Sequence, residues 1–357
     1  MERKILNEFR QDLVSGDWVL FATGRAKRPG PDIEQVFGKQ GRKGPLTISG
    51  SGVSTKSNFG IGTAKCPFDD PIASGQEIIK LYPSEKDWQI AVIKNKYPAL
   101  VYGVCEAPRQ QGPFRVAEAS GFHEVVITRD HNKNLQDFSE IETLEVLKVF
   151  KDRYQTIASE FCGQYILIFH NFGLQAGGSV QHPHSQIMAT PILPPDVMNS
   201  VVGAEKFYLK NNRKVHEVLM NWELEQKTRI VNENESFIAL CPFVSKKPYE
   251  VRIFPKNMSS QFEVTNGNEL ENLAAILNSV LRKLKKVLNN PSYNFFIHSA
   301  PIKVLDAVGM GVEQYYTWHM EIFPHTSTVG GFELGTGMDI NIIDPDKAAS
   351  ELRNADL

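Results

Sequence analysis

Residues 171–186 read Asn171-Phe-Gly-Leu-Gln-Ala-Gly-Gly-Ser179-Val-Gln-His182-Pro-His184-Ser-Gln186. Two glycines and a serine stand just before a His-x-His-x-Gln run. Small residues let a backbone approach a phosphate closely, and their N–H groups can point at its oxygens. Side chains alternate along an extended strand, so positions 182, 184 and 186 share one face. The stretch therefore predicts a phosphate-sized hollow with two imidazoles and an amide along one wall.

The second histidine of this run, His184, is the candidate nucleophile. A neutral imidazole nitrogen that attacks phosphorus forms a covalent phospho-imidazole and divides one displacement into two in-line steps. Gln186 is the candidate donor to the phosphoryl oxygens as they gain charge. The other candidates for phosphate binding are Asn171, Gly177, Gly178 and Ser179. The alternative is that both histidines are metal ligands or lie on a polar surface strand.

A metal site is predicted from Cys66-Pro-Phe-Asp69, which has the spacing of a C-x-x-C half-site with a carboxylate in place of the second cysteine. His131 and His182 would complete a set of one sulfur, one oxygen and two nitrogens, which suits zinc. Spacing alone leaves open the alternative that Cys66 is a buried cysteine near an unrelated aspartate.

A second set of possible metal ligands lies in the C-terminal part of the chain. It consists of His298, His319 and Glu321, the last two at i and i+2. The alternative is that these histidines are satisfied within a domain interface.

Two further segments contain candidate substrate contacts. Arg25 and Arg28, in a turn that ends at Pro29, suit bidentate contacts to phosphate, although a solvated basic turn has the same composition. Asn95 follows an apolar run and can present its amide to a base or a ribose.

Composition excludes several classes of protein. The chain has 357 residues, 41% of them hydrophobic, and a formal net charge of −2 from 39 basic and 41 acidic side chains. This balance gives no general attraction to nucleic acid, and no apolar stretch approaches the ~18 residues of a membrane span. Four cysteines without a C-x-x-C pair, and a start without a signal-like apolar run, favour a reducing, cytoplasmic location.

Hydropathy patterns predict strands at residues 18–21, 89–93, 124–127 and 165–169 and helices at residues 139–159 and 268–288. A pattern of a strand, a helix and a second strand occurs twice along the chain. Val125 in the first copy corresponds to Val251 in the second, and Tyr165 corresponds to Tyr293, at offsets of 126 and 128 positions. A repeat this long indicates a duplicated domain. We therefore predict an α+β fold of two tandem units with antiparallel sheets and flanking helices. The Pro-rich segment at 191–196 divides them into residues 1–193 and 194–357.

These motifs resemble those of the galactose-1-phosphate uridylyltransferases, the nucleotidyltransferase branch of the histidine-triad superfamily. The resemblance spans most of the chain. It rests on the arginine turn, Asn95-Lys-Tyr-Pro-Ala-Leu, Asp130-His-x-Lys, Gly177-Gly-Ser-x-x-His-Pro-His-x-Gln, His298-Ser-Ala-Pro and Trp318-His-x-x-x-Phe-Pro. It implies two histidine-triad-like units in one chain, and a homodimer with the active site near the subunit interface.

The resemblance also implies roles for single residues. His184 takes the place of the residue that carries the nucleotidyl group. The other matches are the zinc ligands Cys66, His131 and His182, the phosphate contacts Asn171, Ser179 and Gln186, the arginine turn at Arg25 and Arg28, the nucleoside contact Asn95, and the second-metal ligands His298 and His319.

The chain departs from the family pattern at several positions. Asp69 stands where a second zinc cysteine is usual, and Glu321 stands where many members have a histidine, which makes a second metal doubtful. The segment 330–337 lacks the Lys and Tyr that some uridylyltransferases use to hold the hexose phosphate. Together with Ser185 and the segment 121–126, this looks like the plant-type ADP-glucose phosphorylase branch.

The sequence therefore predicts a zinc-containing nucleotidyltransferase that binds a nucleotide sugar and a sugar 1-phosphate. Its main predicted reaction is ping-pong transfer of a uridylyl group between UDP-glucose and a hexose 1-phosphate, such as galactose 1-phosphate, through nucleotidyl-His184. The alternatives are an ADP-glucose phosphorylase that passes an adenylyl group to phosphate, a hydrolase of dinucleotides, and a catalytically silent protein that binds nucleotide sugars.

Overall fold

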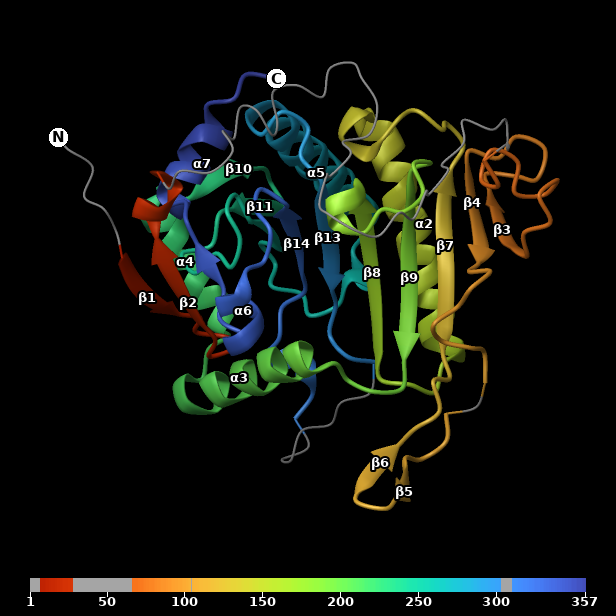
Figure 1. Cartoon of the computed structure of the whole chain (residues 1–357), viewed down its shortest axis with the longest axis horizontal. Helices are drawn as coiled ribbons and strands as arrows, with labels where there is room; N and C mark the ends of the chain where they lie inside the picture. Colours follow the sequence, from red (N-terminus) through yellow and green to blue (C-terminus); the bar gives the residue numbers. More distant parts are fainter. Residues whose placement is uncertain (1–6, 28–65, 104, 303–309) are drawn as a thin grey trace, which may run out of the picture.

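The computed structural model describes residues 7–27, 66–103, 105–302 and 310–357. Its centre is one antiparallel sheet of ten strands with flanking helices, which confirms the predicted α+β class (Figure 1). The strands, in spatial order, are β10 (Ile230–Glu233), β11 (Phe237–Leu240), β12 (Val251–Pro255), β14 (His319–Pro324), β13 (Tyr293–His298), β8 (Tyr165–Phe172), β9 (His184–Thr190), β7 (Phe122–Thr128), β4 (Ile90–Lys94) and β3 (Ile78–Tyr82).

The two halves of this sheet have the same topology. If the strands are numbered along the chain within each half, they lie in the order 1-2-3-5-4, as β3, β4, β7, β9, β8 and as β10, β11, β12, β14, β13. The fourth strands, β8 and β13, pair antiparallel from Tyr293↔Phe172 to His298↔Leu167 and join the halves. This pairing removes an open edge from each half. The duplicated units therefore form one continuous sheet, and the boundary between residues 193 and 194 stays a prediction.

One face of the sheet is covered by α2 (Glu140–Glu160) and α5 (Gly267–Val287), the crossover helices of the two halves. Each begins with a capping box, Ser139 with Glu142 and Asn266 with Glu269, so both predicted helices are confirmed to within one residue. Apolar side chains of both helices, of the strands beneath them and of α7 (Pro345–Arg353) form one core. No helix of the described residues is both long and apolar enough to cross a bilayer.

The remaining elements gather mostly around the C-terminal half (Figure 1). β2 (Trp18–Ala22) pairs with β1 (Asn7–Gln11) and with β15 (Ile340–Asn341), so the strand predicted at 18–21 lies outside the main sheet. The helices here are α3 (Pro195–Asn211), α4 (Val215–Gln226) and α6 (Gly331–Thr336). A small hairpin of β5 (Arg109–Gln111) and β6 (Phe114–Val116) projects from the N-terminal half. Short 3-10 turns are η1 (Thr23–Lys27), η2 (Leu135–Asp137), η3 (Leu174–Ala176), η4 (Phe262–Val264) and η5 (Val312–Gln314).

Cys105 and Cys162 form a disulfide with an S–S distance of 2.04 Å. It links the segment that follows β4 to the residues that follow α2, whereas Cys66 and Cys241 are free. Nothing in the cysteine spacing indicated this pair, because the two residues are 57 positions apart and only the packing of the chain brings them together.

A buried ion pair fastens α2 to the sheet. Arg153 donates from Nε and Nη2 to the two carboxylate oxygens of Glu124 on β7, at 2.9 and 2.7 Å, and the Glu124 side chain is fully buried. We expect Arg153→Met to lower the free energy of unfolding by about 3–5 kcal/mol, because it leaves a buried carboxylate without its partner. Urea denaturation of the variant measures this loss.

The control is Lys148→Met on the same helix, whose ion pair with Glu145 is exposed and should change the free energy of unfolding by only ~0.5 kcal/mol. The double variant Arg153→Met/Glu124→Leu should regain most of the stability, since no unpaired charge remains. Equal losses for Arg153→Met and Lys148→Met would contradict a stabilising buried pair.

Candidate active site

The alternation of β9 decides which side chains face the candidate site. Ile187 and Ala189 belong to the core beneath α2 and α5, so the intervening positions point away from these helices. His184 and Gln186 are two of these positions and are only partly buried. The predicted sharing of one face by these two residues is thus present, on the side of the sheet opposite α2 and α5.

His184 is held in one tautomer by the backbone. Its Nδ1–H donates to the carbonyl oxygen of His182 at 2.9 Å, which leaves the lone pair on Nε2. Nε2 has no hydrogen bond to any other described residue. Burial lowers the pKa of His184 below its usual value, although the bond to His182 acts in the opposite direction. The ring is therefore neutral at physiological pH and has one free nitrogen, as a nucleophile requires.

Phe68 packs against the histidine run. Its ring meets His184 edge-on at 5.4 Å and His182 at 5.9 Å between centroids. It also packs on Val125 and Ile127, whose side chains lie on the same face as His184. The Cys66–Asp69 segment therefore shapes the surroundings of His184 as well as supplying possible metal ligands.

Backbone geometry accounts for the two glycines of the predicted phosphate loop, Gly177 and Gly178. Gly177 has φ +80°, and a Cβ on Gly178 would lie 3.0 Å from the carbonyl oxygens of Asn171 and Gly173. The N–H groups of Gly177 and Gly178 donate to carbonyls within the loop, Leu174 O and Gly173 O. The expectation that these two N–H groups point at a phosphate therefore has no support in this arrangement, and the exposed Ser179 remains available.

The amides of Gln186, Asn95 and Asn171 each lie close to a polar side chain of another strand. Gln186 Oε1 accepts from His123 Nε2 at 2.8 Å, and Asn95 Nδ2 lies 3.0 Å from the same ring nitrogen. Asn171 Oδ1 accepts from Asn294 Nδ2 of β13 at 2.7 Å. The structure thus places Asn95 and Gln186 beside the same nitrogen of His123. Sequence reasoning missed His123 and Asn294, because only strand pairing brings them to the site.

The predicted metal ligands Cys66, Asp69, His131 and His182 gather in one place. Their ligand atoms all lie within 4.8 Å of one another. His182 donates from Nε2 to Thr128 O at 2.6 Å, so its Nδ1 lone pair faces the other three. Nδ1 lies 3.8 Å from Cys66 Sγ, 3.2 Å from Asp69 Oδ1 and 3.1 Å from His131 Nδ1.

The three distances from His182 are close to those around a tetrahedral zinc ion, for which bonds of ~2.0–2.3 Å separate neighbouring ligand atoms by roughly 3.3–3.7 Å. Asp69 Oδ1 and His131 Nδ1, at 2.6 Å, form a hydrogen bond that a bound zinc ion would replace. The mixture of sulfur, oxygen and nitrogen also suits zinc. Burial raises the pKa of the Cys66 thiol, a shift that a bound cation opposes by stabilising the thiolate. A zinc ion held here would keep His182, and with it the carbonyl that bonds His184, in place.

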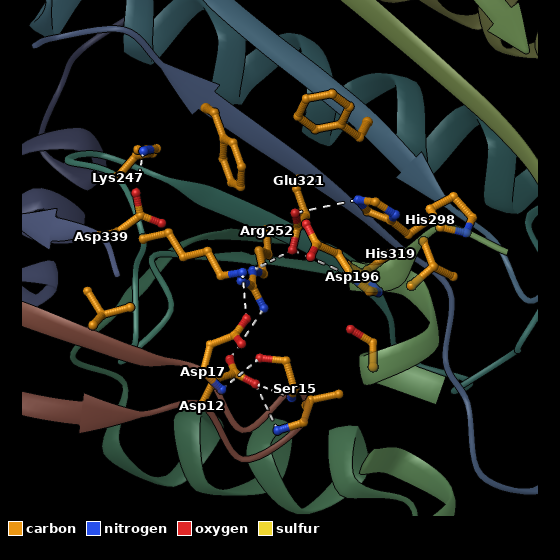
Figure 2. A pocket seen from close by; sticks show the side chains of 18 of the residues that line it. Asp12, Ser15, Asp17, Asp196, Lys247, Arg252, His298, His319, Glu321 and Asp339 are labelled. Carbon is orange, nitrogen blue, oxygen red and sulfur yellow. Dashed lines mark hydrogen bonds and ion pairs between the residues drawn. The ribbon is translucent and has the colours of Figure 1, made fainter. Parts of the chain in front are cut away.

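The second predicted metal set is arranged differently. His298 Nε2 and His319 Nε2 lie 3.5 and 3.6 Å from the oxygens of Glu321, but Arg252 Nε lies 3.0 Å from the same carboxylate (Figure 2). Burial acts to raise the pKa of Glu321, yet the Arg252 charge holds it well below the usual range. Among the residues that the structure describes, the Cys66 group is the one cluster of three or more His, Cys, Asp or Glu side chains whose ligand atoms are arranged to hold a metal ion. The second metal site stays a prediction. This arrangement does not favour it, because the Arg252 guanidinium already neutralises the Glu321 carboxylate.

The second set of predicted ligands lines a cavity of about 510 Å³. The cavity lies between the sheet, the loop that joins β1 to β2, and the start of α3 (Figure 2). Neither His184 nor Gln186 lines it. Its charged groups are largely paired, Lys246 with Asp17 at 2.9 Å and Lys247 with Asp339 at 2.5 Å. The cavity is therefore the counterpart of the His184 site in the other half, not part of it.

The arginine turn is not gathered with these groups. Arg25 is exposed in η1 and makes no hydrogen bond or ion pair with another described residue. Arg28 lies outside the described residues. Their predicted contact with phosphate stays a prediction.

Known proteins resemble this chain along its whole length. Residues 68–194 match the family model for galactose-1-phosphate uridyl transferase, N-terminal domain, and residues 202–347 match the model for its C-terminal domain. An ADP-glucose phosphorylase of Arabidopsis thaliana is 31% identical over 355 residues, which cover 98% of this chain and 93% of that protein. A galactose-1-phosphate uridylyltransferase of Thermotoga maritima is 30% identical over 282 residues, covering 76% of this chain and 86% of that protein.

Solved structures give a similar result. The crystal structure of an ADP-glucose phosphorylase from Arabidopsis thaliana with bound ADP-glucose has a TM-score of 0.79 at 29% identity, covering 99% of this chain and 100% of that chain. The structure of a uridylyltransferase mutant has a TM-score of 0.68 at 26% identity, covering 75% of this chain and 88% of that chain.

Zinc content tests the metal cluster. We expect the purified protein to contain about one zinc ion per chain and Cys66→Ala to lose most of it, because the substitution removes the sulfur ligand. Element-specific mass spectrometry after gel filtration measures both. Cys241→Ala, which changes the other free cysteine, and His298→Ala, in the second set, should leave the zinc content unchanged. A Cys66→Ala variant with full zinc content would rule out the assignment.

Proposed function

This chain belongs to the galactose-1-phosphate uridyl transferase family, and from that membership we propose that it transfers a nucleotidyl group from a nucleoside-diphosphate sugar through His184. The observation that carries the proposal is the state of this ring. Its Nδ1–H is bonded to the His182 carbonyl, and its Nε2 makes no hydrogen bond to another described residue, on the face of β9 opposite α2 and α5. A ring held in this way can attack phosphorus without first losing a proton.

In the first half-reaction, His184 Nε2 attacks the α-phosphorus and forms an N–P bond. The P–O bond to the sugar 1-phosphate breaks, and that oxygen leaves with the electron pair. The ring gains positive charge as the bond forms, so the Nδ1–H···O bond to His182 becomes stronger and stabilises it. In the second half-reaction an acceptor phosphate oxygen attacks the same phosphorus, the N–P bond breaks and neutral His184 returns.

We assign the surrounding side chains by their positions. The Gln186 and Asn171 amides and the Ser179 hydroxyl would contact the phosphoryl oxygens, and Asn95 the nucleoside. Arg25 and Arg28 would contact phosphate, and Gly177 and Gly178 would shape the loop beside it. Zinc held by the Cys66 cluster would maintain the backbone around His182. A homodimer remains a further proposal of the family resemblance.

The favoured reaction is that of an ADP-glucose phosphorylase, in which the adenylyl group passes to inorganic phosphate. Two lines of support reinforce one another. The match to the Arabidopsis thaliana enzyme covers 98% of this chain, against 76% for the Thermotoga maritima uridylyltransferase. The 330–337 segment also lacks the Lys and Tyr that some uridylyltransferases use for the hexose phosphate. Transfer of a uridylyl group between UDP-glucose and galactose 1-phosphate, the main prediction from the sequence, becomes the second candidate.

The covalent intermediate provides the test. Incubation with ADP-glucose labelled in the α-phosphate should give protein-bound, acid-labile label that is absent from His184→Ala, since that variant lacks the attacking nitrogen. His319→Ala is the matched control, because His319 occupies the same position in β14 and its Nδ1 contacts Thr317 O at 3.2 Å. It should keep the label. Tight binding of ADP-glucose without any bound label would favour the catalytically silent alternative.

The choice of substrates is tested by supplying ADP-glucose and UDP-glucose side by side, each with phosphate or galactose 1-phosphate. We expect ADP-glucose with phosphate to give the highest kcat/KM. A higher value for UDP-glucose with galactose 1-phosphate would restore the uridylyltransferase reading while leaving the role of His184 intact.

A further inference from the structure

We propose that two histidines outside the phosphoryl pocket, His123 and His325, are positioning residues that fix which end of each flanking amide faces the phosphoryl group. His123 acts on Gln186, and His325 acts on Asn171 through Asn294. The inference rests on the proposed function, because it assumes that the two amides donate to phosphoryl oxygens. A reversed amide would point its oxygen at the developing negative charge and would oppose the reaction.

The orientation of Gln186 follows from a backbone donor. Ala99 N–H donates to His123 Nδ1 at 3.1 Å, so this nitrogen carries the lone pair and the neutral ring carries its proton on Nε2. His123 Nε2–H then donates to Gln186 Oε1 at 2.8 Å. The Asn95 NH2 group, whose Oδ1 accepts from Tyr97 N–H, lies 3.0 Å from the same nitrogen and makes no hydrogen bond to it in this tautomer. The Gln186 NH2 group is left for another acceptor. His123 lies on β7, two positions before Val125, the residue that pairs with Gln186, and it is buried, so solvent does not compete for the bond.

The orientation of Asn171 follows from a backbone acceptor. Asn294 Nδ2 lies 2.9 Å from Ala176 O, which can only accept, so this atom is the NH2 group. The same group donates to Asn171 Oδ1 at 2.7 Å. Asn294 Oδ1 is therefore the acceptor for His325 Nε2 at 2.5 Å. The NH2 group of Asn171 is left toward the loop that contains Gly177.

The second chain of contacts crosses between the halves. Asn294 and His325 belong to the C-terminal half, whereas Asn171 and Ala176 belong to the N-terminal half. The C-terminal half would thus contribute to the reaction by holding the phosphate loop of the other half. Asn294 and His325 would do this without touching the substrate themselves.

The repeat supplies an internal comparison. Strand pairing makes Glu321 the counterpart of Gln186 and Glu250 the counterpart of His123, because Val125 faces Gln186 as Arg252 faces Glu321. The structure thus matches Val125 to Arg252 and corrects by one position the match to Val251 that the sequence predicted. A carboxylate has two equivalent oxygens and needs no partner to orient it. Glu250 instead binds the backbone N–H groups of Lys246 and Lys247 and the Arg252 side chain. The orienting histidine thus occurs only beside an amide, and it is not a general feature of the fold.

Crossed double-mutant cycles test the proposal, with the single-turnover rate of label transfer from ADP-glucose to the enzyme as the readout. We expect Gln186→Ala to slow this rate on the order of 10²-fold, as loss of one oxyanion donor does. His123→Ala should slow it roughly 10-fold to 100-fold. The double variant should be no slower than Gln186→Ala alone, because His123 acts only through Gln186. His325→Ala should slow the rate less than His123→Ala does, because the Ala176 carbonyl still orients Asn294. The double variant His325→Ala/Asn171→Ala should be no slower than Asn171→Ala alone.

The crossed pairs are the controls. His123→Ala with Asn171→Ala, and His325→Ala with Gln186→Ala, share no partner, so their effects on the rate should multiply. If a histidine only maintained the fold, its substitution by alanine would slow label transfer by the same factor in every variant background. Multiplied effects within the pairs His123/Gln186 and His325/Asn171 would overturn the proposal.

An acceptor-only substitution gives a second criterion. His123→Glu can only accept at neutral pH, so it should turn the Gln186 NH2 group toward itself and slow the reaction more than His123→Ala. This difference should vanish in the Gln186→Ala background, whereas simple charge repulsion would persist there. A glutamate variant as fast as the alanine variant in the presence of Gln186 would contradict the mechanism.

Calorimetry with ADP on the same variants separates this proposal from the proposed function. If the wild type binds ADP but forms no covalent label, the nucleotidyl-histidine route fails. The same double-mutant cycles, with the dissociation constant of ADP measured in place of the rate, then still test the positioning roles of His123 and His325. Coupled losses within pairs would support them, and additive losses would overturn them. If the wild type shows neither label nor binding, both proposals fail.

Discussion

The register of β9 between β7 and β8 is the constraint on which the rest of the site depends. Ile187 and Ala189 are fixed against the helices α2 and α5 by burial, so His184 and Gln186 must face the other way. Because side chains alternate, a slip of one residue would bury the imidazole in the core and turn Ser185 outward. The free Nε2 of His184, the Phe68 contact and the metal cluster at His182 all follow from this one register. The apolar core therefore positions the polar chemistry.

One fold has produced two different sites. The two halves have the same strand order, and each places a histidine at the start of its fifth strand with Nδ1 near a carbonyl two residues earlier. Around His184 the partners are neutral amides and a possible zinc cluster. Around His319 they are Glu321 and the Arg252 guanidinium, which form a closed set of charges. In the proposed mechanism, an anionic phosphate would meet donors at the first site and a paired carboxylate at the second. Function thus lies in the residues placed on the shared scaffold.

The sequence predicted what depends on local pattern. The capping residues and apolar periodicity of α2 and α5, the two-fold repeat and the residues of the zinc-like cluster were all readable, because each rests on spacing or on a conspicuous motif. The fusion of β8 with β13 was not readable, so Asn294 and His325 remained without a role. His123 was missed because only the pairing of β7 with β9 brings it to Gln186. The Cys105–Cys162 disulfide and Arg252 were missed for the same reason: these contacts join residues far apart in sequence, and only the folded sheet defines them.

In the proposed mechanism, Nε2 of His184 is the atom that carries the nucleotidyl group. The most direct measurement is the site of attachment, obtained from ³¹P NMR of the enzyme after reaction with ADP-glucose together with peptide mapping by mass spectrometry. We expect a phosphoramidate on the peptide that contains His184, with the phosphorus on Nε2, because Nδ1 donates its hydrogen bond to the His182 carbonyl. Attachment to another residue, or to Nδ1, would contradict it.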